Sequence, residues 1–555
     1  EANEFESKSF NLLKEEILEL LPVLSNSERA SLVTSKGAQL NSIIATSLLT
    51  SNYSPSNLAF DVILFQKNLL LESERAIYSI VSSDSLLKKQ FEQFFDLKRK
   101  LSYLSSSLYN NPDKSEYEKL LEDLASLESK LMRKFPEGKL NSRNENYTHK
   151  NIRNHLSSNE CAIEFISYTE GNKKYYSALL AFSTNENPIS IHLINKKMLD
   201  SINNLIEENY SSDNLSGRTY ELNKHLYHMF WEPLEPYLKG VKTIYYSPID
   251  ELNNMSFSSF VTNSVDTAYL MDKYNLQSVM STAAIIRNKI PNINNVPQTI
   301  ALFGGVQYDL KTSNTQNSEL IVSRSIRGAT QKNKQRNDVS ELPFTQNEID
   351  NVSDILQKAK WTILKESNVK ATENKIKELE SGRNPTILHF ATHGFAFPDF
   401  VSNSTSTNIF ESSENPMQRS GLLFYGASDT WNGKRDTVLK YTGEDGVLTA
   451  EEVSNLDLTN TRLVVMSACQ SGLGAIKGTE GVYGLKRAFK LAGVENMIVS
   501  LWPVPDKETM ELMNLFYEEL VKIKDINESF QKAQKTMRYK YPNNPWAWGG
   551  FVLVR

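Results

Sequence analysis

Two side chains that could carry out nucleophilic chemistry follow two short apolar segments of this 555-residue chain. His393 comes directly after residues 386–392, and Cys469 comes directly after residues 463–468. Apolar runs of this length are typical of buried strands, and the carboxyl ends of parallel strands meet at one crevice of a sheet. A thiol beside an imidazole can form a thiolate at neutral pH. The pair therefore predicts a cysteine hydrolase.

The composition is that of an ordinary globular protein and indicates neither nucleic-acid nor membrane partners. The chain is 40% apolar and 23% charged, with 61 basic and 66 acidic residues. This near balance lacks the basic excess of a nucleic-acid-binding protein, and no apolar stretch approaches the roughly 20 residues that span a bilayer. Cys161 and Cys469 are the two cysteines, so no disulfide framework is expected. Because a lone reactive thiol persists most easily in a reducing compartment, we predict a cytoplasmic protein with an inert Cys161.

The spacing of apolar residues divides the chain into a helical region and two α/β halves. Residues 64–73 and 117–128 carry apolar residues three and four apart, which predicts amphipathic helices in a region spanning 1–150. Strand-like runs begin after it, and strands then alternate with helices through 151–295 and 296–555. This alternation predicts a mostly parallel sheet covered by helices on both faces.

Two polar segments interrupt this order. Residues 397–443, which leave the histidine directly, are expected to be a long connection bordering the crevice, with Lys434 and Arg435 in solvent. Residues 307–341 fit a functional loop or a surface insertion equally well, and self-cleavage there, for instance after Arg327, is a hypothesis.

Several motifs resemble, in order, those of the CHAT domain. They are residues 389–394, 446–452, 466–474, 478–482 and 500–506, and the resemblance extends to 231–238, 247–250 and 548–553. CHAT domains belong with caspases and separases in one clan of cysteine peptidases. The resemblance implies a caspase-like α/β fold, duplicated as a non-catalytic half (151–295) and a catalytic half (296–555). The helices before it are similar to the end of the TPR array that precedes CHAT in many bacterial proteins.

The resemblance implies roles for three residues of the central motifs. Cys469 is the nucleophile, His393 is its catalytic partner, and the backbone N–H groups of Gly394 and Cys469 form an oxyanion hole. A glycine after the histidine lets the backbone approach a substrate carbonyl closely. Each such donor lowers the barrier by roughly 3–4 kcal/mol.

Zinc is an alternative that the sequence disfavours. His389 and His393 have the i, i+4 spacing of a zinc-binding helix, but they follow a strand-like run and lack a glutamate next to the first histidine. We therefore predict no metal and no cofactor, and expect His389 to pack inside or to brace the crevice.

Three further residues have both a structural and a functional interpretation. Asp506 is predicted to be a helix N-cap or the floor of a pocket for a basic side chain, as in the similar segment of separases. Trp502 walls that pocket or packs in the core. Glu480 complements a helix N-terminus or contacts the substrate backbone.

These residues together predict a cysteine endopeptidase that cleaves protein substrates through an acyl-enzyme. A regulatory protein or ligand acting through the N-terminal helices is expected to switch it on, in a setting such as bacterial defence. Two alternatives stay open: a catalytically silent scaffold that binds peptides, and a thiol transferase or amidase acting on small molecules.

Overall fold

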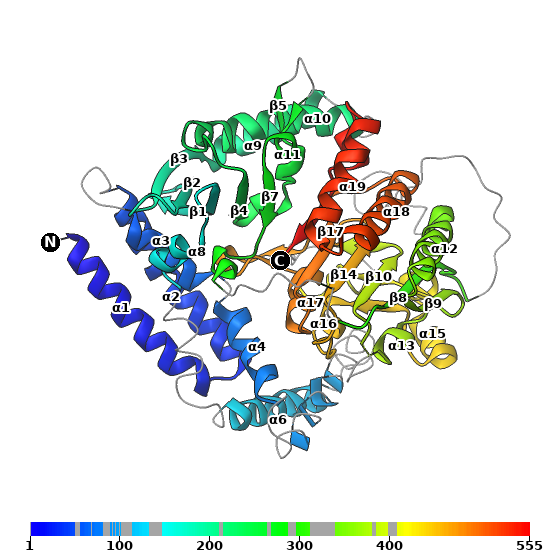
Figure 1. Ribbon diagram of the computed structural model, residues 1–555. Helices are drawn as coiled ribbons and strands as arrows, with labels where there is room; N and C mark the ends of the chain where they lie inside the picture. The colour runs from blue at the N-terminus through cyan, green and yellow to red at the C-terminus, as the bar shows by residue number, and fades with distance from the viewer. Residues whose placement is uncertain are drawn as a thin grey trace.

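A computed structural model describes most of the chain (Figure 1). It covers residues 2–49, 56–67, 69–81, 114–132, 147–209, 215–263, 268–286, 296–310, 339–379, 384–397 and 408–555, with residue 293 and a few positions between 89 and 101. Within these ranges, a group of N-terminal helices lies beside one large sheet with helices on both faces. None of the described helices is both long and apolar enough to cross a bilayer.

The N-terminal region is helical, as predicted. Its α-helices are α1 (Ala2–Leu20), α2 (Asn26–Leu49), α3 (Asn57–Gln66), α4 (Leu69–Val81), α6 (Lys114–Met132) and α8 (His149–His155). Residues 64–73 were expected to form one helix, and this prediction is wrong. The helix ends at Gln66 because Lys67 takes an extended conformation (φ −64°, ψ 124°) and a new helix starts at Leu69.

The first α/β half has three parallel strands and an antiparallel hairpin. The parallel strands are β1 (Glu160–Glu170), β4 (Thr243–Ser247) and β7 (Asn275–Ser278). The hairpin strands β2 (Lys173–Phe182) and β3 (Ile189–Asn195) extend the sheet beyond β1. The other α-helices and strands of this half are α9 (Lys196–Asn209), α10 (Leu215–Phe230), α11 (Leu270–Lys273), β5 (Val261–Asn263) and β6 (Ala268–Tyr269).

The second half has five parallel strands in the order β9-β8-β10-β14-β17. These strands are β8 (Thr299–Val306), β9 (Thr362–Asn368), β10 (Ile387–Ala391), β14 (Leu463–Ser467) and β17 (Asn496–Ser500). One face packs on α12 (Pro343–Lys358), α18 (Asp506–Ile523) and α19 (Ile526–Lys540), and the other on α13 (Glu373–Lys377), α16 (Ala450–Val453) and α17 (Leu485–Leu491). This confirms the predicted mostly parallel sheet with helices on both faces.

The two halves form a single sheet of eleven strands. The last strand, β18 (Phe551–Val554), runs antiparallel to β17 and parallel to β7, so it joins the halves. The parallel strands of the two halves therefore point in opposite directions. As a result, the carboxyl ends of β10 and β14 lie at the opposite edge of the sheet from those of β1 and β4.

The connection after the histidine is more ordered than predicted. Residues 394–396 (β11), 420–423 (β12) and 447–449 (β13) form a separate three-stranded antiparallel sheet, and α14 (Ala427–Trp431) and α15 (Arg435–Thr442) lie between its strands. The strand at 420–423 forms because both of its neighbours supply backbone partners. Arg327, the hypothetical cleavage position, lies outside the described residues.

Lys67 anchors the N-terminal helices in the first half. Its ammonium is buried and lies 2.6 Å from Glu164 Oε2, and it also donates to Ser247 Oγ at 2.7 Å. The other carboxylate oxygen of Glu164 accepts the N–H and hydroxyl of Thr282. Burial lowers the pKa of Lys67, against the opposing charge of Glu164. Since a buried charge is stable only when it is paired and hydrogen-bonded, this contact fixes where α3 ends.

We therefore expect Lys67→Met to destabilise the protein by about 3–5 kcal/mol, because it leaves the Glu164 carboxylate buried without its counter-charge. The double variant Lys67→Met/Glu164→Leu is expected to be more stable than Lys67→Met alone. Urea unfolding of the full chain measures both. Lys8→Met, which removes an exposed pair with Glu4, is the control and should leave the midpoint unchanged. Equal effects of the Lys67 and Lys8 variants would show that the buried pair does not anchor the helices.

Candidate active site

The register between β10 and β14 brings the histidine and cysteine segments together. The strands are parallel, and Ala391 pairs with Ser467. Continuing this register by two residues sets His393 opposite Cys469. Alternate residues of both strands face alternate sides of the sheet: Ile387, Leu463 and Val465 pack with α12 and α18, whereas Leu388, Val464 and Met466 pack with α16 and α17. By this alternation His393 and Cys469 share the α12/α18 face.

Gly394 lies directly against the backbone of Cys469. A Cβ atom added at this glycine would come within 2.6 Å of the Cys469 carbonyl oxygen. Any side chain at position 394 would therefore push the two segments apart. Leu423 N–H also donates to the His393 carbonyl at 3.0 Å, which ties the segment to β12. The sequence led us to expect that Gly394 lets the backbone approach a substrate carbonyl closely. In this structure the backbone of Gly394 instead approaches the carbonyl of Cys469.

The imidazole of His393 is buried, with 1% of the residue exposed. Its Nε2 donates to the Ser340 carbonyl at 2.7 Å, in the segment that leads into α12. This places the proton of a neutral ring on Nε2 and makes Nδ1 the basic nitrogen. The ring lies 5.0 Å from that of Tyr308, whose hydroxyl accepts the His393 backbone N–H. The sequence analysis did not predict a role for Tyr308 at the site. Tyr308 lies just after β8, the neighbour of β10, so its position after a strand end was the signal that could have identified it.

Cys469 is also covered, with none of its surface exposed. Its sulfur accepts the backbone N–H of Val504 at 3.1 Å, from the loop between β17 and α18. The other cysteine, Cys161, lies within β1, where burial raises the pKa of its thiol well above the usual value. A thiolate at Cys161 is therefore disfavoured.

His389 faces the same helices as His393 but lies deeper in the structure. Its Nε2 is 2.9 Å from Glu348 Oε1 on α12, and its Nδ1 is 3.1 Å from the Tyr517 hydroxyl on α18. Burial and the charge of Glu348 raise the pKa of Tyr517 well above its usual range. His389 therefore connects the sheet to both covering helices.

Asp506 is the first residue of α18 and Pro505 is the N-cap, so the prediction that Asp506 is the N-cap is wrong. It is 2% exposed, and its Oδ2 accepts the backbone N–H of Phe344 in the first turn of α12 at 3.0 Å. The carboxylate thus complements the N-terminal ends of two helices. In this structure it holds the starts of α12 and α18 together.

Trp502 is packed between the end of β17 and the segment before β18. Its Nε1 donates to the Trp546 carbonyl at 3.3 Å, and a Cβ atom on Gly550 would come within 2.7 Å of the same nitrogen. It contacts the hydrophobic clusters on both faces of the sheet. These are contacts of a packing residue at the sheet's edge.

Glu480 lies in a short 3-10 turn after the nucleophile, between β15 (Ala475–Ile476) and β16 (Val482–Tyr483). It is 6% exposed and accepts the Leu70 N–H of α4 at 3.0 Å. Arg487 on α17 lies 3.2 Å from its other oxygen and 3.0 Å from Glu74 of α4. Burial raises the pKa of Glu480, although Arg487 acts against this. Glu480 therefore joins the N-terminal helices to the hairpin that follows the nucleophile.

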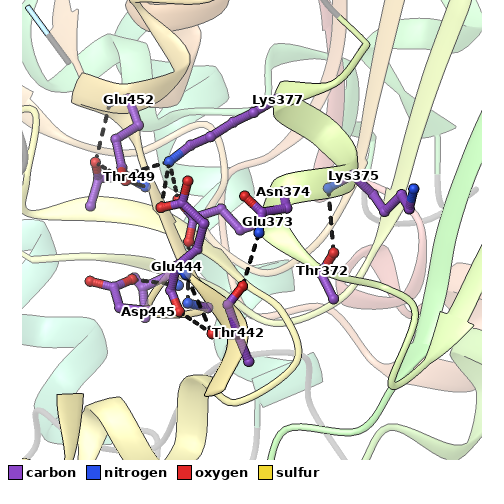
Figure 2. A network of polar contacts seen from close by, with 12 residues as sticks. Thr372, Glu373, Asn374, Lys375, Lys377, Thr442, Glu444, Asp445, Thr449 and Glu452 are labelled. Carbon is purple, nitrogen blue, oxygen red and sulfur yellow. Dashed lines mark hydrogen bonds and ion pairs between the residues drawn. The ribbon is translucent and has the colours of Figure 1, made fainter. Parts of the chain in front are cut away.

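A network of charges fixes the small sheet that carries Gly394 (Figure 2). Lys377 Nζ lies 2.6 Å from Glu373, 3.0 Å from Glu444 and 3.2 Å from Glu452. The carboxylate oxygens lie within 4.8 Å of one another, a spacing that could suit a metal ion, but the ammonium already bridges all three. Glu373 also accepts the N–H of Gly446 just before β13. The network thus holds β13, and through it β12 and β11.

The same loop holds a second buried ion pair. Arg435 Nε donates to Asp445 Oδ2 at 2.7 Å, and both residues are buried. The prediction that Arg435 is in solvent is therefore wrong, whereas Lys434 is exposed as expected.

The carboxylates of the Lys377 network differ in protonation. Burial and the negative charge of Glu452 raise the pKa of Glu373 well above its usual value. Burial acts in the same direction on Glu452, but Lys377 and the Thr449 N–H outweigh it and lower the Glu452 pKa. Glu373 is therefore the group that retains a proton, and Glu452 is the ionised partner of Lys377.

We expect Glu373→Gln to change the pH dependence of stability. Because the Glu373 pKa is higher in the fold than in the unfolded chain, its stabilising contribution is present at low pH and is lost as the pH rises through the folded value. An uncharged glutamine removes this loss, so urea unfolding of the variant should show a smaller fall in stability than wild type as the pH rises above the usual glutamate pKa. Glu452→Ala, which removes the ionised partner and its capping box with Thr449, should cost about 1–2 kcal/mol throughout. Parallel pH profiles of wild type and Glu373→Gln would contradict the assignment.

Comparisons with known proteins relate most of this chain to one domain family. The CHAT domain model matches residues 221–555. Tetratricopeptide repeat protein 28 of Mus musculus is 31% identical over 112 residues, and its Homo sapiens counterpart is 32% identical over 112 residues; each match spans 20% of this chain but only 4% of the relative.

Among solved structures, the separase–securin complex of Saccharomyces cerevisiae aligns over 100% of this chain and 40% of its own, at 9% identity and a TM-score of 0.41. The RgpB pro- and mature-domain complex of Porphyromonas gingivalis aligns over 65% of this chain and 76% of its own, at 12% identity and a TM-score of 0.32. Since the family model matches more than half of the residues, including every segment of the candidate site, this chain belongs to the CHAT domain family.

Proposed function

We propose that this protein is a cysteine endopeptidase and that the structure is its closed, resting form. The observation that carries the proposal is the β10–β14 register, which sets His393 opposite Cys469 on one face of the sheet, with Gly394 against the Cys469 carbonyl. A nucleophile and a base on adjacent strand ends, beside two backbone donors, form the arrangement that acyl transfer requires.

In the proposed reaction, the Cys469 thiol gives its proton to the imidazole of His393, and the sulfur attacks the carbonyl carbon of a peptide bond. The carbonyl oxygen becomes an oxyanion and accepts hydrogen bonds from the N–H groups of Gly394 and Cys469. The C–N bond then breaks, and His393 returns the proton to the leaving amine. Water, deprotonated by His393, hydrolyses the thioester and frees the sulfur.

Burial of both reacting groups supports latency. The Val504 N–H donates a hydrogen bond to the Cys469 sulfur, and Nε2 of His393 donates one to the Ser340 carbonyl. The two covering segments end at the first turns of α18 and α12, which Asp506 joins through Phe344 N–H. A shift of these two helix starts would therefore uncover the sulfur and the imidazole together.

The N-terminal helices are placed to transmit an activating signal. Leu70 of α4 binds Glu480 in the turn of the hairpin that follows Cys469, and Glu74 of α4 binds Arg487 just after this hairpin. A regulatory protein or ligand that moves α4 would pull on this hairpin. We include such a regulator in the proposal, with defence of a bacterial host as the setting suggested by the CHAT resemblance.

Asp506 is the proposed determinant of specificity. If opening separates it from Phe344, a buried carboxylate at the edge of the site becomes available to a lysine or arginine side chain of the substrate. In this proposal Trp502 forms a neighbouring wall, whereas Glu480 acts through its contact with α4.

The first test is the pH profile of Cys469 alkylation by iodoacetamide in the native full-length protein. Transient opening should let the reagent reach Cys469, and a thiolate paired with His393 should give a rate that changes little between about pH 6 and pH 8. In His393→Gln the rate should instead rise about 100-fold over the same range, as for an ordinary thiol. Mass spectrometry of the cysteine peptides measures both rates.

Cys161 is the internal control, because its thiol is buried within a strand and should stay unlabelled while the protein is folded. Identical pH profiles for the wild type and His393→Gln would show that the two side chains do not act as a pair.

The second test maps new protein N-termini after the full chain is added to a cell extract that can supply an activator. Wild type should generate N-termini that are absent with Cys469→Ala, and lysine or arginine should precede the cuts. Asp506→Asn should reduce cleavage after basic residues by about tenfold or more.

An apolar preference before the cuts would rule out the role of Asp506 without affecting the dyad. If Cys469 of the wild type alkylates as predicted but wild type and Cys469→Ala produce identical N-termini, the result would favour a silent peptide-binding scaffold. Cleavage of small amides alone would favour an amidase.

A further inference from the structure

A hollow lies over the sheet at the point where its two halves join. Its empty volume is about 630 Å³, part of which is open to solvent. The floor includes Tyr246, Ser278 and Val554, which occupy one row across β4, β7 and β18. The walls are formed by Lys67, by Lys486 of α17, and by Gly478, Thr479, Gly481 and Val482 of the hairpin after the nucleophile. Neither His393 nor Cys469 lines this junction hollow, so it is separate from the candidate active site.

Lys486 is unusual among the buried cations of the described residues. It is 7% exposed and has no carboxylate or carbonyl partner within those residues. Every other buried lysine or arginine there donates to a protein oxygen: Arg29 to Glu128, Lys67 to Glu164, Arg419 to Ser413, Arg435 to Asp445, Arg487 to Glu480 and Lys490 to Glu495. Burial alone lowers the pKa of Lys486 to about 8. Because this largely buried lysine has no protein acceptor for its ammonium in the described part of the chain, a group in the hollow that supplies negative charge would stabilise it.

The surroundings of the ammonium specify the charge and polarity of such a group. The lining contains two lysines and no acidic residue, and Glu164 already neutralises one of them, Lys67. One positive charge therefore remains to be balanced. Ser278 and Thr479 add hydroxyl groups, whereas Leu501 and Val552 are apolar.

We propose that the junction hollow is a binding site for a small organic monocarboxylate, whose carboxylate pairs with Lys486 and whose apolar body lies against Leu501 and Val552. One negative charge matches the one uncompensated ammonium, and a carboxylate can accept from both the ammonium and a neighbouring hydroxyl. Most small-molecule sites share this design of apolar walls with a few convergent polar groups.

Occupancy would stabilise the wall that leads to the nucleophile. The hairpin at 478–482 touches the hollow on one side and α4 on the other, through Glu480 and Leu70. A bound carboxylate would fasten α17 and this hairpin to the floor formed by the joined halves. Binding is a property of the hollow itself and does not depend on the proposed peptidase activity.

The test is calorimetric titration of the full chain with hexanoate, with hexanamide as the neutral analogue of the same shape. Hexanoate should bind at least about tenfold more tightly than hexanamide, because the amide cannot balance the charge of Lys486. Lys486→Met should reduce hexanoate affinity by about tenfold or more, whereas Lys477→Met, an exposed lysine of the same hairpin, should leave it unchanged.

Lys486→Met is expected to fold, since it replaces an unpaired buried charge by an apolar side chain of similar length. The comparison of hexanoate with hexanamide tests the proposal in the unmodified protein as well. Equal affinity for the two compounds, an affinity unaffected by Lys486→Met, or no heat of binding at millimolar hexanoate would each overturn it. Tighter binding of inorganic phosphate than of hexanoate would overturn the monocarboxylate assignment.

Discussion

The register between β10 and β14 is the constraint on which the candidate site depends. A slip of one residue would turn every side chain of β10 to the opposite face and would separate His393 from Cys469. The two faces differ in their partners: alternate residues pack against α12 and α18 or against α16 and α17, and both sets are fully buried. Moving one set into the other's place would disrupt close packing on both sides of the sheet. The alignment of the reacting groups is therefore maintained by the apolar cores, at some distance from the chemistry.

Backbone groups, rather than side chains, cover the site. The Ser340 carbonyl and the Val504 N–H hold the imidazole and the sulfur, and both belong to segments that lead directly into helices. Asp506 joins the first turns of those helices, so the two covers are mechanically connected. This arrangement suits a site that opens as a whole, because neither cover can move far while the bond to Phe344 remains.

Local patterns were sufficient to predict the elements that bear the motifs. The runs before His393 and Cys469 are mostly apolar and form the strands β10 and β14, and the helix predicted at 117–128 lies within α6. Features that depend on distant partners could not be predicted in this way. The helix across 64–73 is broken because Lys67 meets Glu164, nearly one hundred residues away. Arg435 is buried because Asp445 neutralises it, although the surrounding sequence is polar.

Glu480 shows the same difficulty at the level of function. Its position after the nucleophile suggested a contact with the start of the following helix or with substrate. Glu480 instead accepts the N–H of Leu70 in the first turn of α4, and it pairs with Arg487 of α17, which also pairs with Glu74. No spacing within the motif could reveal a partner four hundred residues earlier in the chain. The consequence is physical: two buried carboxylates share one guanidinium, so displacing α4 would leave Arg487 and Glu480 buried with fewer counter-charges. Movement of the N-terminal helices is thereby coupled energetically to the hairpin beside Cys469.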